Sequence, residues 1–340
     1  MKLTAISLVR DEADIIEAWA RHNLQMVDRL YVVDDGSTDA TPEILRRLAA
    51  EGLDVRIVDD GVHASLVQSR RIRALMAHAV SDDSWDYVFP IDADEFIAAE
   101  SRQVLEEDLA ALPAPHVGGL CPLHYRSSPQ DDPADPDPLS RLKNVVVHDP
   151  YPFKVAIPRH LAEHPETGIQ DGYHKITQWQ NVIPSPILPR VPLAHFPMRS
   201  REQLVAKCVI GYMRWRARDD FRETFATMMM EAARILRDEK TLELEHFERF
   251  EATYAPYSGN ATMFRPFTER RGRVAYSDLS ATYPYRRILA AAEGLIDGAR
   301  AAAQENRALK HQLELSRGGA FSHFVAKTRR SLMKRLTRRG

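Results

Sequence analysis

Short apolar runs alternate with amphipathic stretches along the first hundred residues of this 340-residue chain. Four runs rich in apolar and β-branched residues predict strands at 3–9, 29–33, 55–58 and 88–97. Between them, apolar residues recur at helical spacing; in the third such stretch they are Ile72, Leu75, Met76 and Ala79. This alternation predicts an α/β fold with a mostly parallel, doubly wound (Rossmann-like) sheet flanked by helices.

Polar residues mark the expected ends of the helices. Asp11 and Asp14 predict a helix start, because carboxylates stabilise the positive end of a helix. Thr41 is the predicted N-cap of the next helix, with Pro42 at its first position and Gly52 just past its end.

Charged residues follow each predicted strand. They are Arg10-Asp11-Glu12, Asp34-Asp35, Asp59-Asp60 and Asp92-Ala93-Asp94. In a parallel sheet the carboxyl ends of the strands meet at one edge, and ligands bind there. We therefore expect a ligand site at this edge, although Asp59-Asp60-Gly61 is also typical of a plain turn.

The last of these groups predicts a metal site. Alternation along an extended chain points Asp92 and Asp94 the same way, so both can face one hard cation, Mn²⁺ or Mg²⁺. The alternative is an acidic turn that caps the next helix. Because no Gly-x-Gly-x-x-Gly and no Walker motif occurs, phosphates are expected to be held through the metal.

The second half of the chain is predominantly helical in pattern. Ser200 and Gln203 form a capping-box pattern that opens a helix with Leu204 and Cys208 facing inward. The predicted organisation is a catalytic domain at 1–200, a helical region at 201–290 packed on it, and a helical extension with a basic tail at 291–340.

Composition narrows the class of protein. Hydrophobic residues make up 44% of the chain, enough for a large core, and two cysteines give no disulfide framework. No signal peptide and no membrane span are predicted. A protein of the reducing cytoplasm is therefore expected.

The charge is unevenly placed. Eight of the 46 Lys and Arg residues and none of the 48 acidic ones lie at 317–340, so the rest carries a formal charge of −10. A helical tail at 318–340 would be basic and amphipathic, which suits an anionic membrane surface on the inner face. The alternative is a solvated, partly disordered tail. Nucleic acid is not an expected partner.

Three motifs resemble those of family 2 glycosyltransferases with the A-type fold. They are Ser7-Leu-Val-Arg-Asp-Glu12, Val32-Val-Asp-Asp-Gly-Ser-Thr-Asp39 and Phe89-Pro-Ile-Asp-Ala-Asp-Glu-Phe96. The third is similar to the metal motif of a bacterial branch of this family. Later segments extend the resemblance to about residue 215; they are the surroundings of Lys154, Gly172-Tyr-His174 and Ala194-His-Phe-Pro-Met-Arg-Ser200.

The resemblance implies roles for single residues. The nucleotide pocket would be lined by Val9, Arg10 and Glu12, and Asp34 or Asp35 would bind the base. Asp92 would contact the ribose or the metal-bound phosphate, and Asp94 and His195 the metal and the diphosphate. Arg70 or Arg71 would neutralise the diphosphate. The alternative is that both arginines simply lie on the solvent-exposed face of a helix.

The catalytic base has no clear motif. Asp171, three residues before His174, is the first candidate, with Glu95 and Glu166 as rivals, and His174 itself joins the catalytic group. Structural roles for His174 and His195 are the alternative.

The resulting hypothesis is an inverting, metal-dependent glycosyltransferase. It would move a sugar from a nucleotide-diphosphate sugar, with a UDP-sugar as the expected donor, to a glycan or lipid-linked hydroxyl acceptor in bacterial cell-surface glycan synthesis. The rivals are a nucleotidyltransferase on a similar sheet and a non-catalytic binding or scaffold protein.

Overall fold

The computed structural model describes residues 1–59, 68–113, 117–128, 130–132, 135, 137–151, 153–217, 227–238, 246, 250, 261–268, 272–277, 285 and 287–309. The chain divides into two compact units, Met1–Ile288 and Leu289–Gly340. In the second unit, residues 289–309 are helical. The predicted basic tail at 318–340 lies outside the described residues.

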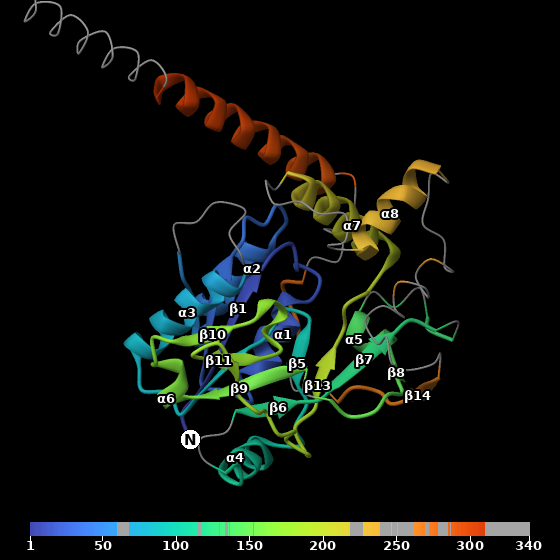
Figure 1. Ribbon diagram of the computed structural model, residues 1–340. Helices are drawn as coiled ribbons and strands as arrows, with labels where there is room; N and C mark the ends of the chain where they lie inside the picture. The colour runs from blue at the N-terminus through green and yellow to red at the C-terminus, as the bar shows by residue number, and fades with distance from the viewer. Residues whose placement is uncertain are drawn as a thin grey trace, which may run out of the picture. The chain divides into compact units, whose positions relative to one another are not determined.

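A six-stranded sheet forms the centre of the first unit (Figure 1). Its order is β3-β2-β1-β4-β9-β6. The strands are β1 Leu3–Val9, β2 Arg29–Asp34, β3 Val55–Ile57, β4 Tyr87–Pro90, β6 Gly118–Leu120 and β9 Lys154–Pro158. The first four are parallel, and β9 and β6 extend the sheet in antiparallel fashion. The predicted α/β fold with a mostly parallel sheet is confirmed.

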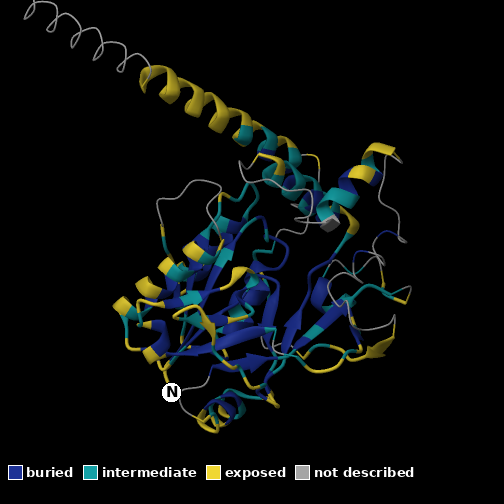
Figure 2. Ribbon diagram, in the orientation of Figure 1, coloured by how far each residue is buried: buried dark blue, intermediate teal, exposed yellow. Residues whose placement is uncertain are grey.

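Alternating side chains divide the core between the two faces of this sheet. Leu3 and Ala5 of β1 pack in the core that includes α1 (Ile16–Asn23) and α2 (Thr41–Ala50). Ile6 packs on the opposite face with the apolar side of α3 (Gln68–Asp82), as the helical spacing predicted. Figure 2 shows these strands buried and the outer faces of the helices exposed. The sheet is thus covered on both faces.

Two further sheets complete the unit. The five-stranded sheet β14-β8-β7-β13-β5 contains β5 Glu95–Ile97, β7 Pro122–Arg126, β8 Asn144–Val146, β13 Leu193–His195 and β14 Thr262–Phe264. The three-stranded sheet contains β10 Thr167–Ile169, β11 Ile176–Gln178 and β12 Asn181–Val182. The remaining helices are α4 Arg102–Ala110, α5 Pro138–Arg141, α6 Arg159–Ala162, the 3₁₀ turn Asp171–Tyr173, α7 Arg201–Arg216 and α8 Thr227–Asp238.

The predicted start of the first helix is wrong. α1 begins at Ile16, and Asp11 lies before it with a positive φ of 53°. The carboxylate of Asp11 accepts hydrogen bonds from N and Oγ1 of Thr38 at 2.6 and 3.1 Å. Asp11 therefore ties two loops together, and a tertiary contact replaces the local cap.

The second helix ends where predicted but begins one residue earlier than predicted. Thr41 is the first helical residue and Ala40 is the N-cap, while Oδ1 of Asp39 accepts the N–H of Thr41 at 2.9 Å. Gly52 lies just past the end with a φ of 92°, a conformation that favours glycine. The predicted helix end is confirmed.

The predicted strand at 88–97 is broken into two. β4 and β5 belong to different sheets, and residues 91–94 turn between them. The N–H of Glu95 donates to O of Asp92 at 3.1 Å, which closes the turn. Asp92 and Asp94 therefore do not alternate along one strand.

The capping pattern at Ser200 is confirmed. Oγ of Ser200 accepts the N–H of Gln203 at 3.1 Å at the start of α7, and Leu204 and Cys208 are buried. Within the described part of the chain, none of the helices has the length and apolarity that crossing a bilayer requires.

Candidate active site

The carboxyl ends of β1 and β2 bring the first two polar groups together. Val9 stands opposite Asp34 in the register, and O of Val9 accepts the N–H of Asp35 at 2.8 Å. Nη1 of Arg10 donates to O of Asp35 at 2.7 Å. The predicted nucleotide-binding residues of these two strands are therefore neighbours at one edge, as expected for parallel strands.

The two aspartates of the second group have different partners. Asp34 accepts the N–H of Ser37 at 3.1 Å and stabilises the following turn. Asp35 is contacted by three guanidinium groups, those of Arg10, Arg71 and Arg214. Burial alone would raise the pKa of Asp35, but Arg214 and Arg71 lower it, so this carboxylate is ionised at neutral pH. Base binding by either aspartate stays a prediction.

Glu12 belongs to a buried ion-pair network. Arg199, which is 1% exposed, pairs with Glu12 and also donates from Nε to Oδ2 of Asp14 at 2.7 Å. Burial, opposed by Arg199, raises the pKa of Glu12 to about 7. Arg199 thus joins the loop after β1 to the segment before α7.

Asp94, Glu95 and His195 form one buried group. Each offers a ligand atom, and these atoms lie within 4.8 Å of one another. Nε2 of His195 lies 3.7 Å from Oδ1 of Asp94. The pairing of β13 with β5 sets this geometry, because His195 stands opposite Glu95 in the register.

These residues fit a divalent cation. Two carboxylates and one imidazole give a mixed oxygen and nitrogen set, which suits Mn²⁺ better than Mg²⁺ because Mg²⁺ prefers oxygen ligands. The buried Oε1 of Glu95 makes no hydrogen bond to any described residue, and Nζ of Lys154 lies 3.3 Å from it as an ion-pair partner. Burial alone would raise the pKa of Asp94, but Lys207 and Arg199 lower it to about 2, so this carboxylate is charged.

The side chain of Asp92 pairs with a lysine and not with the group of Asp94, Glu95 and His195. Nζ of the buried Lys154 donates to Oδ2 of Asp92 and to O of Gly172, both at 2.7 Å. The predicted shared direction of Asp92 and Asp94 is therefore wrong, because the turn between β4 and β5 sends them to different partners. The Asp92 side chain remains 33% exposed, so contact with a donor stays a prediction.

The four candidates for the catalytic group, Asp171, Glu95, Glu166 and His174, differ in their surroundings, and Glu166 is exposed. Asp171 is exposed, and its Oδ1 accepts the N–H of Ser69 at 2.9 Å. Burial raises the pKa of Glu95 to about 8, so this carboxyl holds a proton at neutral pH. Nδ1 of His174 bonds to O of Phe153. Since a carbonyl only accepts, this nitrogen carries the proton, and Nε2 of His174 has the lone pair.

The arginines predicted to meet the diphosphate lie on different sides of α3. Arg70 is exposed, whereas Arg71 is buried and pairs with Asp35.

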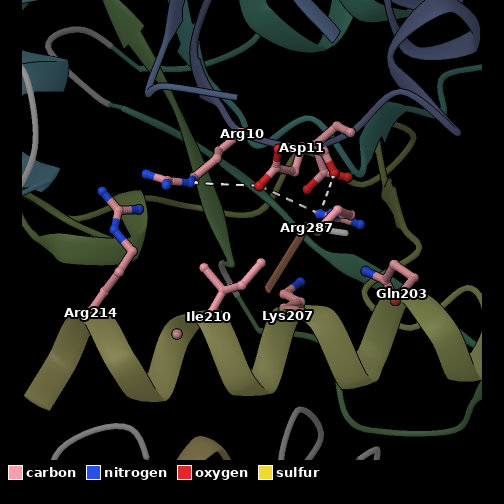
Figure 3. A pocket seen from close by; sticks show the side chains of 9 residues that line it. Arg10, Asp11, Gln203, Lys207, Ile210, Arg214 and Arg287 are labelled. Atoms are coloured by element: carbon pink, nitrogen blue, oxygen red, sulfur yellow. Dashed lines mark hydrogen bonds and ion pairs between the residues drawn. The ribbon is translucent and has the colours of Figure 1, made fainter. Parts of the chain in front are cut away.

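Other cations line a cavity of about 150 Å³ between the loop after β1 and α7 (Figure 3). They are Arg10, Lys207, Arg214 and Arg287.

Several site residues were not assigned from the sequence. A lone lysine before the apolar run of β9 is a usable signal for Lys154, because a buried ammonium needs partners. Lys207, Arg214 and Arg287 have no such signal, since charged residues on helices are ordinarily solvated. His124 sits on β7 beside His195, a proximity that only the pairing of β7 with β13 reveals.

The fold and this edge define a class: an α/β protein whose acidic and basic groups gather where parallel strands end. Residues 8–158 match the family model described as Glycosyl transferase family 2. The chain thus carries a glycosyltransferase domain, in keeping with the A-type fold, and the predicted enzyme class is confirmed. The match ends before His174 and His195. None of the curated proteins matches the sequence.

Solved structures similar to this chain include a mannosyltransferase and a glucosyl-3-phosphoglycerate synthase. Staphylococcus aureus TarS 1–349 with UDP is 14% identical, with a TM-score of 0.32 and coverage of 74% of this chain and 78% of that one. The mannosyltransferase PcManGT from Pyrobaculum calidifontis, with GDP-Man and Mn²⁺, is 18% identical (TM-score 0.36, coverage 88% and 86%). Glucosyl-3-phosphoglycerate synthase from Mycobacterium tuberculosis is 17% identical (TM-score 0.28, coverage 47% and 57%).

Proposed function

We propose that this protein is an inverting glycosyltransferase that depends on Mn²⁺ or a similar divalent cation. It transfers a sugar from a nucleotide-diphosphate sugar to a hydroxyl acceptor. The observation that carries this proposal is the buried group of Asp94, Glu95 and His195 next to the strand ends of a glycosyltransferase domain. Inversion is what the resemblance to family 2 implies.

The residues have separable tasks in such a reaction. Asp94, Glu95 and His195 would hold the cation, which when bound supplies charge neutralisation for the departing nucleoside diphosphate. Lys154 holds Asp92 in place beside this group. His174 presents Nε2 as the acceptor for the proton of the attacking hydroxyl. The buried setting excludes water from the charged groups, which strengthens their interactions.

The decisive experiment is a screen of nucleotide sugars for thermal stabilisation with and without Mn²⁺. A ligand that binds the folded state raises the melting temperature by mass action, so the donor is found without knowledge of the acceptor. The selected donor is then incubated with the enzyme and candidate acceptors. Release of a nucleoside diphosphate supports the proposal, and release of pyrophosphate would support a nucleotidyltransferase.

A pair of variants tests the metal site itself. Asp94→Asn keeps the shape of the side chain but removes the charge, so Mn²⁺-dependent donor binding should be lost. Asp108→Asn is the matched control, because Asp108 is a buried carboxylate of α4 that pairs with Arg190. Equal donor affinity in the Asp94 variant and the wild type would contradict the metal assignment.

We further propose that the enzyme acts in the cytoplasm at the inner membrane surface, on a glycan or lipid-linked acceptor of cell-surface glycan synthesis. Support comes from the sequence of 318–340, where basic residues surround an apolar stripe if the segment is helical. A soluble acceptor analogue used as well as a lipid-linked one would argue against this setting.

A further inference from the structure

A two-residue turn joins β11 to β12 and forms the tip of a hairpin. Gln178 stands opposite Asn181 in the register, so Trp179 and Gln180 make up the whole turn. The other end of the hairpin is anchored in the core, where the side chain of Ile176 is fully buried. The tip therefore projects into solvent from an anchored base.

The backbone of this turn is strained. Trp179 has a φ of 52° and Gln180 a φ of 66°. Two-residue hairpin turns of this kind require a positive φ at both positions, and for that reason Asn and Gly usually occupy them. Tryptophan and glutamine cost free energy here, because their Cβ atoms crowd the backbone. Such strain persists where the side chains themselves have a task, which directs attention to what this tip presents.

The tip presents an indole ring to solvent. Trp179 is 63% exposed, whereas Trp19 and Trp85 are 0% and 2% exposed. The ring of His164 packs against Trp179 in a T-shaped arrangement, with 5.6 Å between the centroids. Nδ1 of His164 accepts the N–H of Glu166 at 3.2 Å, which holds this supporting ring in place. The indole is thus supported by a neighbour and still offers a large apolar surface to a ligand.

The residues beside the indole are polar but uncharged. None of the eight residues from Ile176 to Ile183 carries a charge, in a chain where 28% of the residues are charged. Gln180 and Asn181 are exposed, and Nδ2 of Asn181 donates to O of Trp179 at 3.3 Å, which supports the turn. Amide groups both donate and accept hydrogen bonds. An anionic membrane or a charged peptide meets no opposite charge at this tip, whereas a neutral, hydroxyl-rich ligand is matched by it.

The hairpin also connects this tip to the candidate active site. His174 precedes β11 and Trp179 follows it, so the Cα atoms of the two residues are at most about 18 Å apart. A ligand several sugar units long that places one hydroxyl at His174 is therefore long enough to lie along the hairpin and reach Trp179.

We propose that the tip formed by Trp179, Gln180 and Asn181 binds a neutral stretch of an oligosaccharide acceptor, away from the reacting hydroxyl. The apolar C–H face of a pyranose ring packs on the indole, and the sugar hydroxyls exchange hydrogen bonds with the amides. The inference rests on the proposed function for the reaction at His174. It narrows the acceptor to a glycan of several units, whose end lies at the active site and whose body is held at the tip.

Affinity electrophoresis tests this binding without a donor or a known acceptor. The native protein migrates through gels that contain dextran, amylose or hydroxyethyl cellulose, and at least one of these neutral polysaccharides should retard it. Trp179→Ala should weaken the binding by about tenfold, as expected for the loss of one aromatic contact, and Trp179→Phe should keep part of it. Phe264→Ala is the matched control, because Phe264 is an aromatic residue of β14 that is 69% exposed.

A second variant separates binding from folding. Gln180→Gly removes one amide and also relieves the strain of one positive φ. It should therefore weaken the retardation while the melting temperature rises. Circular dichroism checks that each variant at Trp179 is folded.

The outcomes distinguish this inference from the proposed function. A wild type that none of the three polysaccharides retards, or that is retarded no more than Trp179→Ala, overturns the inference and leaves the proposed function. A dimer in sedimentation equilibrium that Trp179→Ala converts to a monomer also overturns it, because a second copy then covers the indole. Retardation that depends on Trp179, in a protein that transfers no sugar from any donor, supports the glycan surface and overturns the proposed function.

Discussion

Nδ1 of His124 lies 2.9 Å from Nδ1 of His195, and both rings are buried. Nε2 of His124 in turn lies 2.9 Å from the hydroxyl of Tyr151. Two imidazoles can share one hydrogen bond only if one nitrogen donates and the other accepts. If Nδ1 of His195 donates, its Nε2 keeps the lone pair and faces Asp94, the arrangement a metal ligand needs.

His124→Phe should therefore weaken Mn²⁺ binding by about 10- to 100-fold, the usual cost of losing a partner that orients a metal ligand. Electron paramagnetic resonance of free Mn²⁺ gives the affinity without any substrate. Nitrogen-15 NMR of the histidines should show His195 protonated at Nδ1 in the wild type. Protonation at Nε2, with unchanged Mn²⁺ affinity in the variant, would remove His124 from this role.

The strand ends that carry the site could be predicted from the sequence, but the contacts between distant segments could not. Strands β1 and β2 and the groups at Arg10 and Asp35 were predictable, because apolar runs that end in polar residues report strand ends directly. The turn at 91–94 was not, since a run of apolar residues does not show where a chain leaves one sheet for another. Arg287 could not be found either, because its contact with Asp11 joins residues 276 positions apart.

Replacing Lys154 should lower the free energy of unfolding more than replacing most other residues. Its ammonium is buried with Asp92 at 2.7 Å and Glu95 at 3.3 Å, and although burial alone would lower its pKa, these carboxylates raise it. Lys154→Met leaves the partly exposed carboxylate of Asp92 without its cation, so the free energy of unfolding should fall by up to about 3–5 kcal/mol. Lys2→Met is the control, because the exposed pair of Lys2 with Asp83 contributes at most about 1 kcal/mol. Equal losses in urea unfolding would show that the buried pairing is unimportant.

Glu95 should make the metal-free protein less stable as the pH rises. Burial raises its folded-state pKa from 4.5 to about 8. Between these values the folded protein holds a proton that the unfolded chain releases, so the free energy of unfolding falls by up to about 1.4 kcal/mol per pH unit. Glu95→Gln should flatten the curve in this window, and urea unfolding at several pH values measures it. Parallel curves for wild type and variant would mean that Glu95 has an ordinary pKa.

The basic tail is expected to bind anionic membranes. Each Lys or Arg near such a surface contributes about 1 kcal/mol, and salt weakens the attraction because exposed charges are screened over about 8 Å at physiological ionic strength. Truncation after Ser316 should abolish binding to anionic vesicles and preserve turnover of a soluble acceptor analogue. Full-length protein that does not sediment with these vesicles at low salt would contradict the anchor.

His174 should act as the proton acceptor of the transfer reaction. Its Nδ1 proton is held by O of Phe153, and burial lowers the pKa of the ring, so Nε2 stays unprotonated at neutral pH. His174→Gln should lower kcat by about 10²-fold or more, the range for loss of a general base, with little change in donor affinity. His160→Gln, an exposed histidine of α6, should leave kcat unchanged.

The pH profile separates a catalytic from a structural role for this ring. A base works only when unprotonated, so the rate should fall as the pH drops through the lowered pKa of His174, and the variant should lose this acidic limb. Gly172 leaves room for this ring. It has a φ of 76°, which favours glycine, and a Cβ at this position would lie only 2.5 Å from Nε2 of His174. Gly172→Ala should therefore displace the ring and lower kcat while donor binding persists. A variant at His174 that melts earlier but keeps kcat and the acidic limb would assign the proton acceptor to another residue.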